Sequence, residues 1–174
     1  MIREVESLER RVRAFSDFAA EPETKAELLD INSLLKERIR FLAVEHPGIR
    51  YRFEPDNSVP AARADPDQVT GILTNLLQNA AEAAGPQGGI LVTTGRKENM
   101  LTVEVHDSGP GLSDEARLSL FEPSISFKTD GMGLGLSISR KNALLAGGDL
   151  STTEGVLGGA GFRLELPVED ANRE

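Results

Sequence analysis

The chain has 174 residues, 39% of them hydrophobic and none of them cysteine, so it can bury one sizeable core and cannot form disulfides or thiolate metal sites. Its net charge of -9 argues against a nucleic-acid surface, because Lys and Arg are what hold phosphate backbones. Since it shows neither a signal peptide nor an apolar run of about 20 residues, we expect this fragment to be cytoplasmic and to make no membrane contact, even if a longer parent protein is membrane-bound.

The N-terminal segment carries apolar residues at intervals of three and four, which predicts an amphipathic helix over residues 1–20. These residues are Ile2, Val5, Leu8, Val12, Phe15 and Phe18. The stripe fits a helix packed on its own domain, and equally the seam of a coiled coil or bundle that reaches a second chain. Pro22 interrupts the pattern, so residues 21–29 are predicted to be a linker.

Helices and strands then alternate from residue 30 onward. Asp30 is a good N-cap for a helix over 31–46, and Asp65-Pro66 opens a second long helix with an apolar face. Strands are predicted over 49–54, 90–98, 100–107, 149–154 and 161–167, and a third helix over about 134–145. Adjacent strand pairs favour hairpins, so we expect an α+β fold. It would be a two-layer α/β sandwich, with helices on one face of a mixed, mostly antiparallel sheet.

Two stretches next to predicted strand and helix ends are candidates for binding. NLLQNAAEAA, residues 75–84, places Asn75 and Asn79 one turn apart on one helix face. A single amide side chain on the rim of a helix is more often a solvated polar residue or a helix cap. HDSGPGL, residues 106–112, ends a strand with Asp107, and Gly109 and Gly111 let the backbone fold beneath a ligand. The same residues also fit a plain Asx turn.

Two further stretches follow in the second half of the chain. FEPSISFKTD, residues 121–130, has little regular pattern and can close over a ligand. GMGLGLSISR, residues 131–140, has three alternate glycines and runs directly into a helix. This pattern fits a loop shaped around an anion, and it also fits a plain flexible entry to the helix.

In this order the four stretches resemble the N, G1, F and G2 boxes of the ATP-binding catalytic domain of sensor histidine kinases. The nitrogen-sensor (NtrB/NtrY-like) type is the most similar, within the superfamily that includes gyrase B and MutL. The resemblance covers about residues 26–168 and implies the Bergerat fold, with a catalytic domain over 30–168 and a tail over 169–174. Residues 1–20 look like the second helix of a dimerisation domain, through which a homodimer can form.

The resemblance also implies roles for individual residues. Asp107 would accept a hydrogen bond from the adenine amino group, Asn79 would bind Mg²⁺, and Lys128 would be the cation facing the terminal phosphates of ATP. Arg140 is the other candidate cation, and Lys128 also fits an exposed loop lysine. Asn79 and Lys128 are the expected catalytic residues. The expected nucleotide contacts are Asn75, Asn79, Asp107, Gly109, Gly111, Lys128, Gly131, Gly133, Leu134 and Gly135. Residues 122–135 are expected to form a lid that orders around the phosphates.

Departures from the family pattern refine the expected activity. Asn75 stands where ATP-hydrolysing relatives have a water-activating Glu, so we do not expect efficient hydrolysis of ATP. Glu82 stands where some histidine kinases have a basic residue, so neutralisation of the phosphate charge would rest more on Mg²⁺, Lys128 and Arg140. Neither His46 nor His106 has the context of a phosphoacceptor, so we expect the accepting histidine to lie outside this chain.

The leading hypothesis is therefore a protein histidine kinase domain. It would bind Mg-ATP and transfer the γ-phosphate to a histidine of the dimerisation domain of the same kinase, from which a response regulator takes it. One alternative is a nucleotide-sensing module without transfer activity. Another is an anti-sigma-type serine kinase, against which Asn75 counts, because a serine hydroxyl benefits from a carboxylate base.

Overall fold

The computed structural model describes residues 23–123 and 135–169, together with residues 5, 9, 12, 13, 15, 16 and 19. Its helices and strands follow the predicted order with three additions. The elements are β1 (Glu27–Leu29), α2 (Ile31–Glu45), β2 (Arg50–Glu54), β3 (Ala62–Ala64), α3 (Pro66–Ala84), β4 (Gly89–Lys97), β5 (Met100–Asp107), α4 (Asp114–Ser119), α5 (Gly135–Leu145), β6 (Asp149–Thr153) and β7 (Gly161–Pro167).

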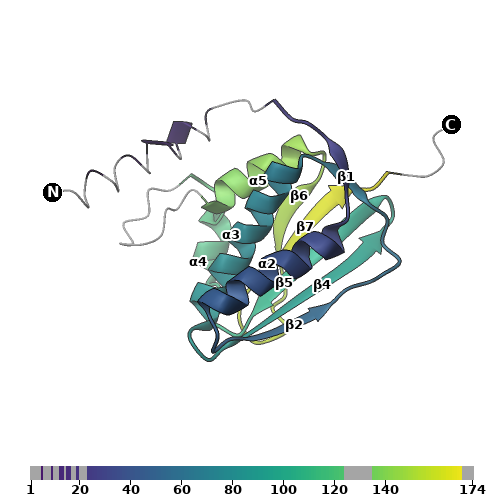
Figure 1. Cartoon of the computed structure of the whole chain (residues 1–174). Coiled ribbons are helices and arrows are strands. Elements are labelled where there is room, and N and C mark those ends of the chain that lie inside the picture. Colours follow the sequence, from purple (N-terminus) through teal and green to yellow (C-terminus); the bar gives the residue numbers. More distant parts are fainter. Residues whose placement is uncertain are drawn as a thin grey trace.

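One mixed sheet of five strands, in the order β2-β4-β5-β7-β6, forms the base of the domain. Strand β2 runs parallel to β4, and the other neighbouring strands are antiparallel. Helices α2, α3 and α5 lie over one face of this sheet (Figure 1). A separate antiparallel pair joins β1 to β3. The predicted two-layer α+β sandwich with a mixed sheet is thus confirmed.

The central helix α3 forms where the sequence predicts it. The Asp65 carboxylate accepts hydrogen bonds from the backbone N–H groups of Asp67 and Gln68, and Pro66 is the first helical residue. The predicted apolar face is buried throughout, and it consists of Val69, Ile72, Leu73, Leu76, Leu77 and Ala80. Ala81 is buried as well. This face belongs to the same core as the inward-facing residues of β5, so α3 is held firmly on the sheet.

Three short elements were not predicted. Strand β1 occupies the last three residues of the range expected to be a linker, and both β1 and β3 are too short for alternation to be visible in the sequence. Helix α4 buries none of its six residues, so it has no apolar periodicity. Its N-terminus is set by Ser113, whose hydroxyl accepts a hydrogen bond from the Ala116 N–H.

The described residues between positions 5 and 19 are helical, as expected. Three apolar side chains of the predicted stripe are exposed there: Val5 by 56%, Val12 by 62% and Phe15 by 64%. The described part of the domain therefore does not bury these three side chains.

Candidate functional site

The carboxylate of Asp107, at the end of β5, is buried and firmly oriented. The residue is only 2% exposed, and its Oδ1 accepts hydrogen bonds from the backbone N–H groups of Gly109 (2.8 Å) and Ala160 (3.2 Å). The first of these bonds is the Asx turn that the sequence allowed. Within the described part of the chain, no donor reaches Oδ2. The residue thus combines a fixed orientation with one oxygen left for another partner.

The two predicted glycines after Asp107 are required for different reasons. A Cβ on Gly109 would lie 2.5 Å from the carbonyl oxygen of Ala83 in the last turn of α3, so only glycine permits this approach. Gly111 has a φ of +77°, a left-handed conformation that glycine adopts without strain. Gly109 thus brings the loop after β5 directly against α3, and Gly111 lies beside Gly159 of the loop between β6 and β7.

The loop between β6 and β7 also builds this site, and sequence reasoning missed it. A Cβ on Gly159 would collide with Oδ1 of Asp107, while backbone hydrogen bonds join Gly159 N–H to Asp107 C=O (3.1 Å) and Asp107 N–H to Ala160 C=O (3.0 Å). The available signal was the glycine-rich sequence GVLGGAG just before the last predicted strand. It could have been read as a close approach of one backbone to another.

One face of α3 connects this end of the site to α5. Asn75, Asn79 and Ala83 are spaced by one turn, so they lie in a row that spans about 12 Å at the rise of an α-helix. At one end of the row Ala83 contacts Gly109, and at the other end the Asn75 side-chain Nδ2 donates to the Ser139 hydroxyl (3.0 Å). Asn79 is half-buried between them. The fold thus brings the first, second and fourth motifs together.

Gly135 lies where the Asn75 side chain meets α5. A Cβ on this residue would stand 2.6 Å from Oδ1 of Asn75, so the amide occupies the place of a side chain. The other expected contacts of the glycine-rich segment and its preceding loop, namely Lys128, Gly131, Gly133 and Leu134, lie outside the described residues. Most of the expected lid also lies outside them.

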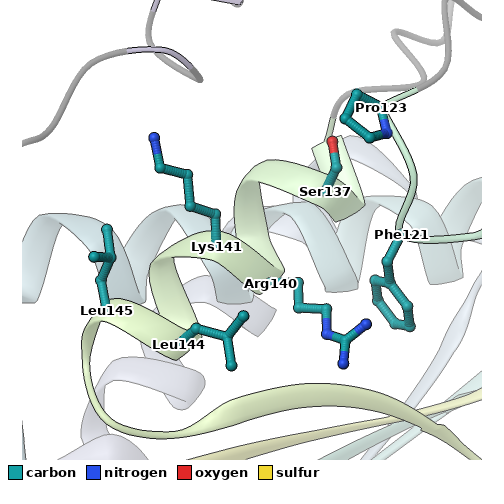
Figure 2. A pocket seen from close by; sticks show the side chains of 7 residues that line it. All are labelled: Phe121, Pro123, Ser137, Arg140, Lys141, Leu144 and Leu145. Carbon is teal, nitrogen blue, oxygen red and sulfur yellow. The ribbon is translucent and has the colours of Figure 1, made fainter.

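Arg140, the second candidate cation, lies on another side of α5. Its Nε donates to Oδ1 of Asp149 in β6 (3.0 Å), and its guanidinium carbon is 5.0 Å from the centre of the Phe121 ring. Figure 2 shows Arg140 and Phe121 facing one another, whereas the side chain of Lys141 points away from that ring. These contacts hold Arg140 away from the face of α5 that Asn75 contacts.

A groove of about 410 Å³ runs along this outer side of α5 (Figure 2). Its lining consists of Phe121, Pro123, Ser137, Arg140, Lys141, Leu144 and Leu145. Leu144 is 54% exposed and Leu145 is 49% exposed. Exposed leucines next to two cationic residues make this groove a candidate contact surface for another polypeptide.

Neither histidine is placed as a phosphoacceptor. His106 is 2% exposed, and its Nε2 lies 3.1 Å from Oε2 of Glu104, which also forms an ion pair with Arg163. His46 is the C-cap of α2, where its backbone N–H donates to the Leu42 carbonyl. His106 is thus a buried imidazole, and His46 is a half-buried helix cap.

Metal binding by protein groups alone is not supported in the described ranges. No cluster of three or more His, Cys, Asp or Glu side chains able to hold an ion occurs there. A divalent cation at Asn79 would need further oxygen ligands from a bound molecule, which is how Mg²⁺ is held with phosphates. Over the same ranges, no helix has the length and apolar character required to cross a membrane.

Comparison with known proteins places these features in one family. A model described as histidine kinase-, DNA gyrase B- and HSP90-like ATPase matches residues 64–170. The nitrogen regulation protein NtrY of Azorhizobium caulinodans is 35% identical over 182 residues, covering all of this chain but only 24% of that protein. This chain therefore spans about a quarter of that relative.

Two solved structures are similar in fold as well as in sequence. The nucleotide-free catalytic domain of histidine kinase ThkA has a TM-score of 0.76 and 33% identity, covering 82% of this chain and 95% of that domain. Histidine kinase ThkA in complex with the response regulator protein TrrA has a TM-score of 0.79 and 28% identity, covering 98% of this chain and 50% of that one.

Proposed function

Because this chain belongs to the family of histidine kinase-, DNA gyrase B- and HSP90-like ATPases, as an ATP-binding catalytic domain of the sensor histidine kinase type, we propose that it acts as a phosphotransferase. It binds Mg-ATP and transfers the γ-phosphate to a histidine of the dimerisation domain of the same kinase. The observation that carries this proposal is the row of α3 residues that joins the buried carboxylate of Asp107 to the beginning of α5.

Asp107 marks the adenine end of the site. Its Oδ2 accepts a hydrogen bond from the 6-amino group of adenine, while Gly109 and Gly111 form the adjacent floor. Guanine carries an acceptor oxygen at the corresponding position, so a carboxylate there selects ATP over GTP. The backbone N–H groups that hold Oδ1 orient the carboxylate before the ligand arrives, which reduces the cost of binding.

The phosphate end lies along α3 and at the start of α5. Asn79 offers its amide oxygen to Mg²⁺, which neutralises charge on the phosphates when bound. Gly135 and the first N–H groups of α5 approach the phosphates, as helix N-termini do for anions. Lys128, Gly131, Gly133 and Leu134 are proposed as further contacts from the sequence. Arg140 is not included, because Asp149 and Phe121 already hold its guanidinium.

The nature of the acceptor follows from the absence of a base at Asn75. An amide cannot take a proton from water or serine, whereas the neutral imidazole of a histidine attacks phosphorus without such help. We place contact with the phosphoacceptor domain at the groove beside α5, where Leu144 and Leu145 are exposed. The complex of ThkA with a response regulator supports a response regulator as the next acceptor.

Phosphotransfer in trans tests this proposal. The chain is incubated with radiolabelled Mg-ATP and a separate dimerisation domain that carries the acceptor histidine, with a His→Gln variant of that domain as the control. We expect label that is labile to acid and stable to base, on the unmodified acceptor only. Tight ATP binding without transfer would support the nucleotide-sensing module, and acid-stable label would support the serine kinase.

A further inference from the structure

The interface between α3 and α5 contains a polar contact that the roles above do not use. The Asn75 side-chain Nδ2 donates to the Ser139 hydroxyl at 3.0 Å, and Ser139 is only 3% exposed. The Asn75 Oδ1 lies against Gly135, the first residue of α5. One amide therefore contacts both the first residue of α5 and a buried hydroxyl one turn later.

We propose that Asn75 and Ser139 are a pair of positioning residues, which fix the N-terminal turn of α5 relative to Asn79. This inference rests on the proposed function, and it assigns Asn75 to the helix interface instead of to direct contact with ATP. The amide is suited to this role because its two ends differ: the nitrogen donates to Ser139, and the oxygen fills the space that the absent Gly135 side chain leaves.

The contact lies in the N-terminal half of α5, where the buried residues are two serines. The helix buries Ala143 near its C-terminal end, but its N-terminal half buries two serines, Ser137 and Ser139, which offer little apolar area. An apolar contact tolerates sliding, whereas a hydrogen bond weakens steeply when its distance or angle changes. The Asn75–Ser139 bond thus sets the register of the first turn of α5 along α3.

The expected consequence is selective for the phosphates. If the first turn of α5 shifts, the distance from Gly135 to Asn79 changes, but the adenine end does not, because Asp107 is held by Gly109 and Ala160. Loss of either partner should therefore weaken binding of ATP and leave binding of adenosine nearly unchanged. A direct ligand contact by Asn75 would instead make the effect independent of Ser139.

The test is a double-mutant cycle of Asn75→Ala and Ser139→Ala, with calorimetric titration of ATP and adenosine. Each single variant should lose about three- to tenfold in ATP affinity, the net worth of one hydrogen bond, and less than twofold in adenosine affinity. The double variant should lose no more than Asn75→Ala alone, because Ser139→Ala removes a bond that Asn75→Ala has already removed. Ser139→Thr keeps the hydroxyl and should restore most of the ATP affinity.

Asn32→Ala is the matched control, because Asn32 also makes two side-chain hydrogen bonds, to Asp56 and Thr94, where α2 meets β4. It should lower thermal stability without changing the ratio of ATP to adenosine affinity. Amide hydrogen exchange of the nucleotide-free variants gives a second readout: residues 135–140 should exchange faster in Asn75→Ala and Ser139→Ala, and at the original rate in Asn32→Ala.

Several results would overturn the inference. Normal ATP affinity in Ser139→Ala together with weak binding in Asn75→Ala would show that Asn75 contacts the ligand directly. Equal losses for ATP and adenosine, or unchanged exchange of residues 135–140, would show that the pair does not position this turn. Failure of the proposed function is distinguishable, since the unmodified chain would then transfer no phosphate or bind no ATP, while the exchange experiment still reports on α5.

Discussion

The variant Asp107→Asn isolates the proposed adenine contact from the structural role of the same side chain. The Asp107 Oδ1 accepts two backbone hydrogen bonds, and asparagine can keep both only if its own oxygen takes that place. Its NH₂ group then stands where Oδ2 was and faces the amino group of adenine, so two donors meet. Loss of a hydrogen bond to a charged acceptor costs about 1.5–3 kcal/mol, or about 10- to 150-fold in affinity.

The same geometry predicts how related measurements change. Thermal unfolding of Asp107→Asn should stay close to that of the unmodified chain. Asp107→Ala should melt several degrees lower, because the backbone N–H groups of Gly109 and Ala160 lose their acceptor, and leaving the buried one unpaired costs about 1–3 kcal/mol. The new NH₂ can donate to the guanine oxygen, so the preference for ATP over GTP should fall or reverse. Calorimetry that finds unchanged ATP affinity in a folded Asp107→Asn variant would refute the adenine assignment.

Three further predictions address the phosphate end, the groove and the fold. Asn79→Ala should abolish the Mg²⁺ dependence of ATP binding while adenosine still binds; equal losses with and without Mg²⁺ would contradict its role. Leu144→Glu should reduce phosphotransfer in trans at least tenfold while ATP affinity stays unchanged. The control Leu118→Glu, on the exposed helix α4, should not reduce it. Equal transfer by the two variants would exclude the groove as the contact surface for the phosphoacceptor domain. Asp65→Ala should cost about 0.5–2 kcal/mol of unfolding free energy, since Asp65 caps α3. Hydrogen bonds from the backbone of Lys25, Gln68 and Asp67 lower the pKa of Asp65 in the folded chain. The difference in unfolding free energy between the unmodified chain and Asp65→Ala should therefore be complete above about pH 4 and disappear as the pH falls further. A difference that stays constant down to about pH 2 would contradict the capping role.

The long elements could be predicted because their local signals agree with their burial. In α3 the cap at Asp65, the proline at the first position and the apolar period all indicate the same helix, and the structure buries that face. Strand β5 alternates clearly, and a tight turn at Glu98, which has a φ of +55°, joins it to the apolar strand β4. The parallel pairing of β2 with β4 depends on contacts distant in the sequence, so only a mixed sheet could be expected.

The candidate site was only partly predictable, because several of its contacts join residues far apart in the chain. Motif order singled out Asp107 and the two asparagines, and the structure shows Asp107 at the end of a strand. No local pattern relates Ala160 to Asp107, which are 53 residues apart, or Ser139 to Asn75, which are 64 apart. Likewise, the engagement of Arg140 by Phe121 and Asp149 depends on how α5 lies against β6.

The two ends of the proposed site are therefore held by different forces. At the adenine end, Asp107 sits on a central strand of the sheet, and two backbone loops hold its carboxylate, so its position is as stable as the core. At the phosphate end, we propose that the Asn75–Ser139 hydrogen bond positions the first turn of α5, and such a bond is worth only about 0.5–1.5 kcal/mol net. This difference in stability between the two ends suits a domain that recognises adenine in the same way before and after phosphate transfer. The phosphate contacts, in contrast, must form with ATP and relax once the γ-phosphate has left. A core contact in place of the Asn75–Ser139 bond would hold α5 equally well in both states, and ADP would then leave no more easily than ATP.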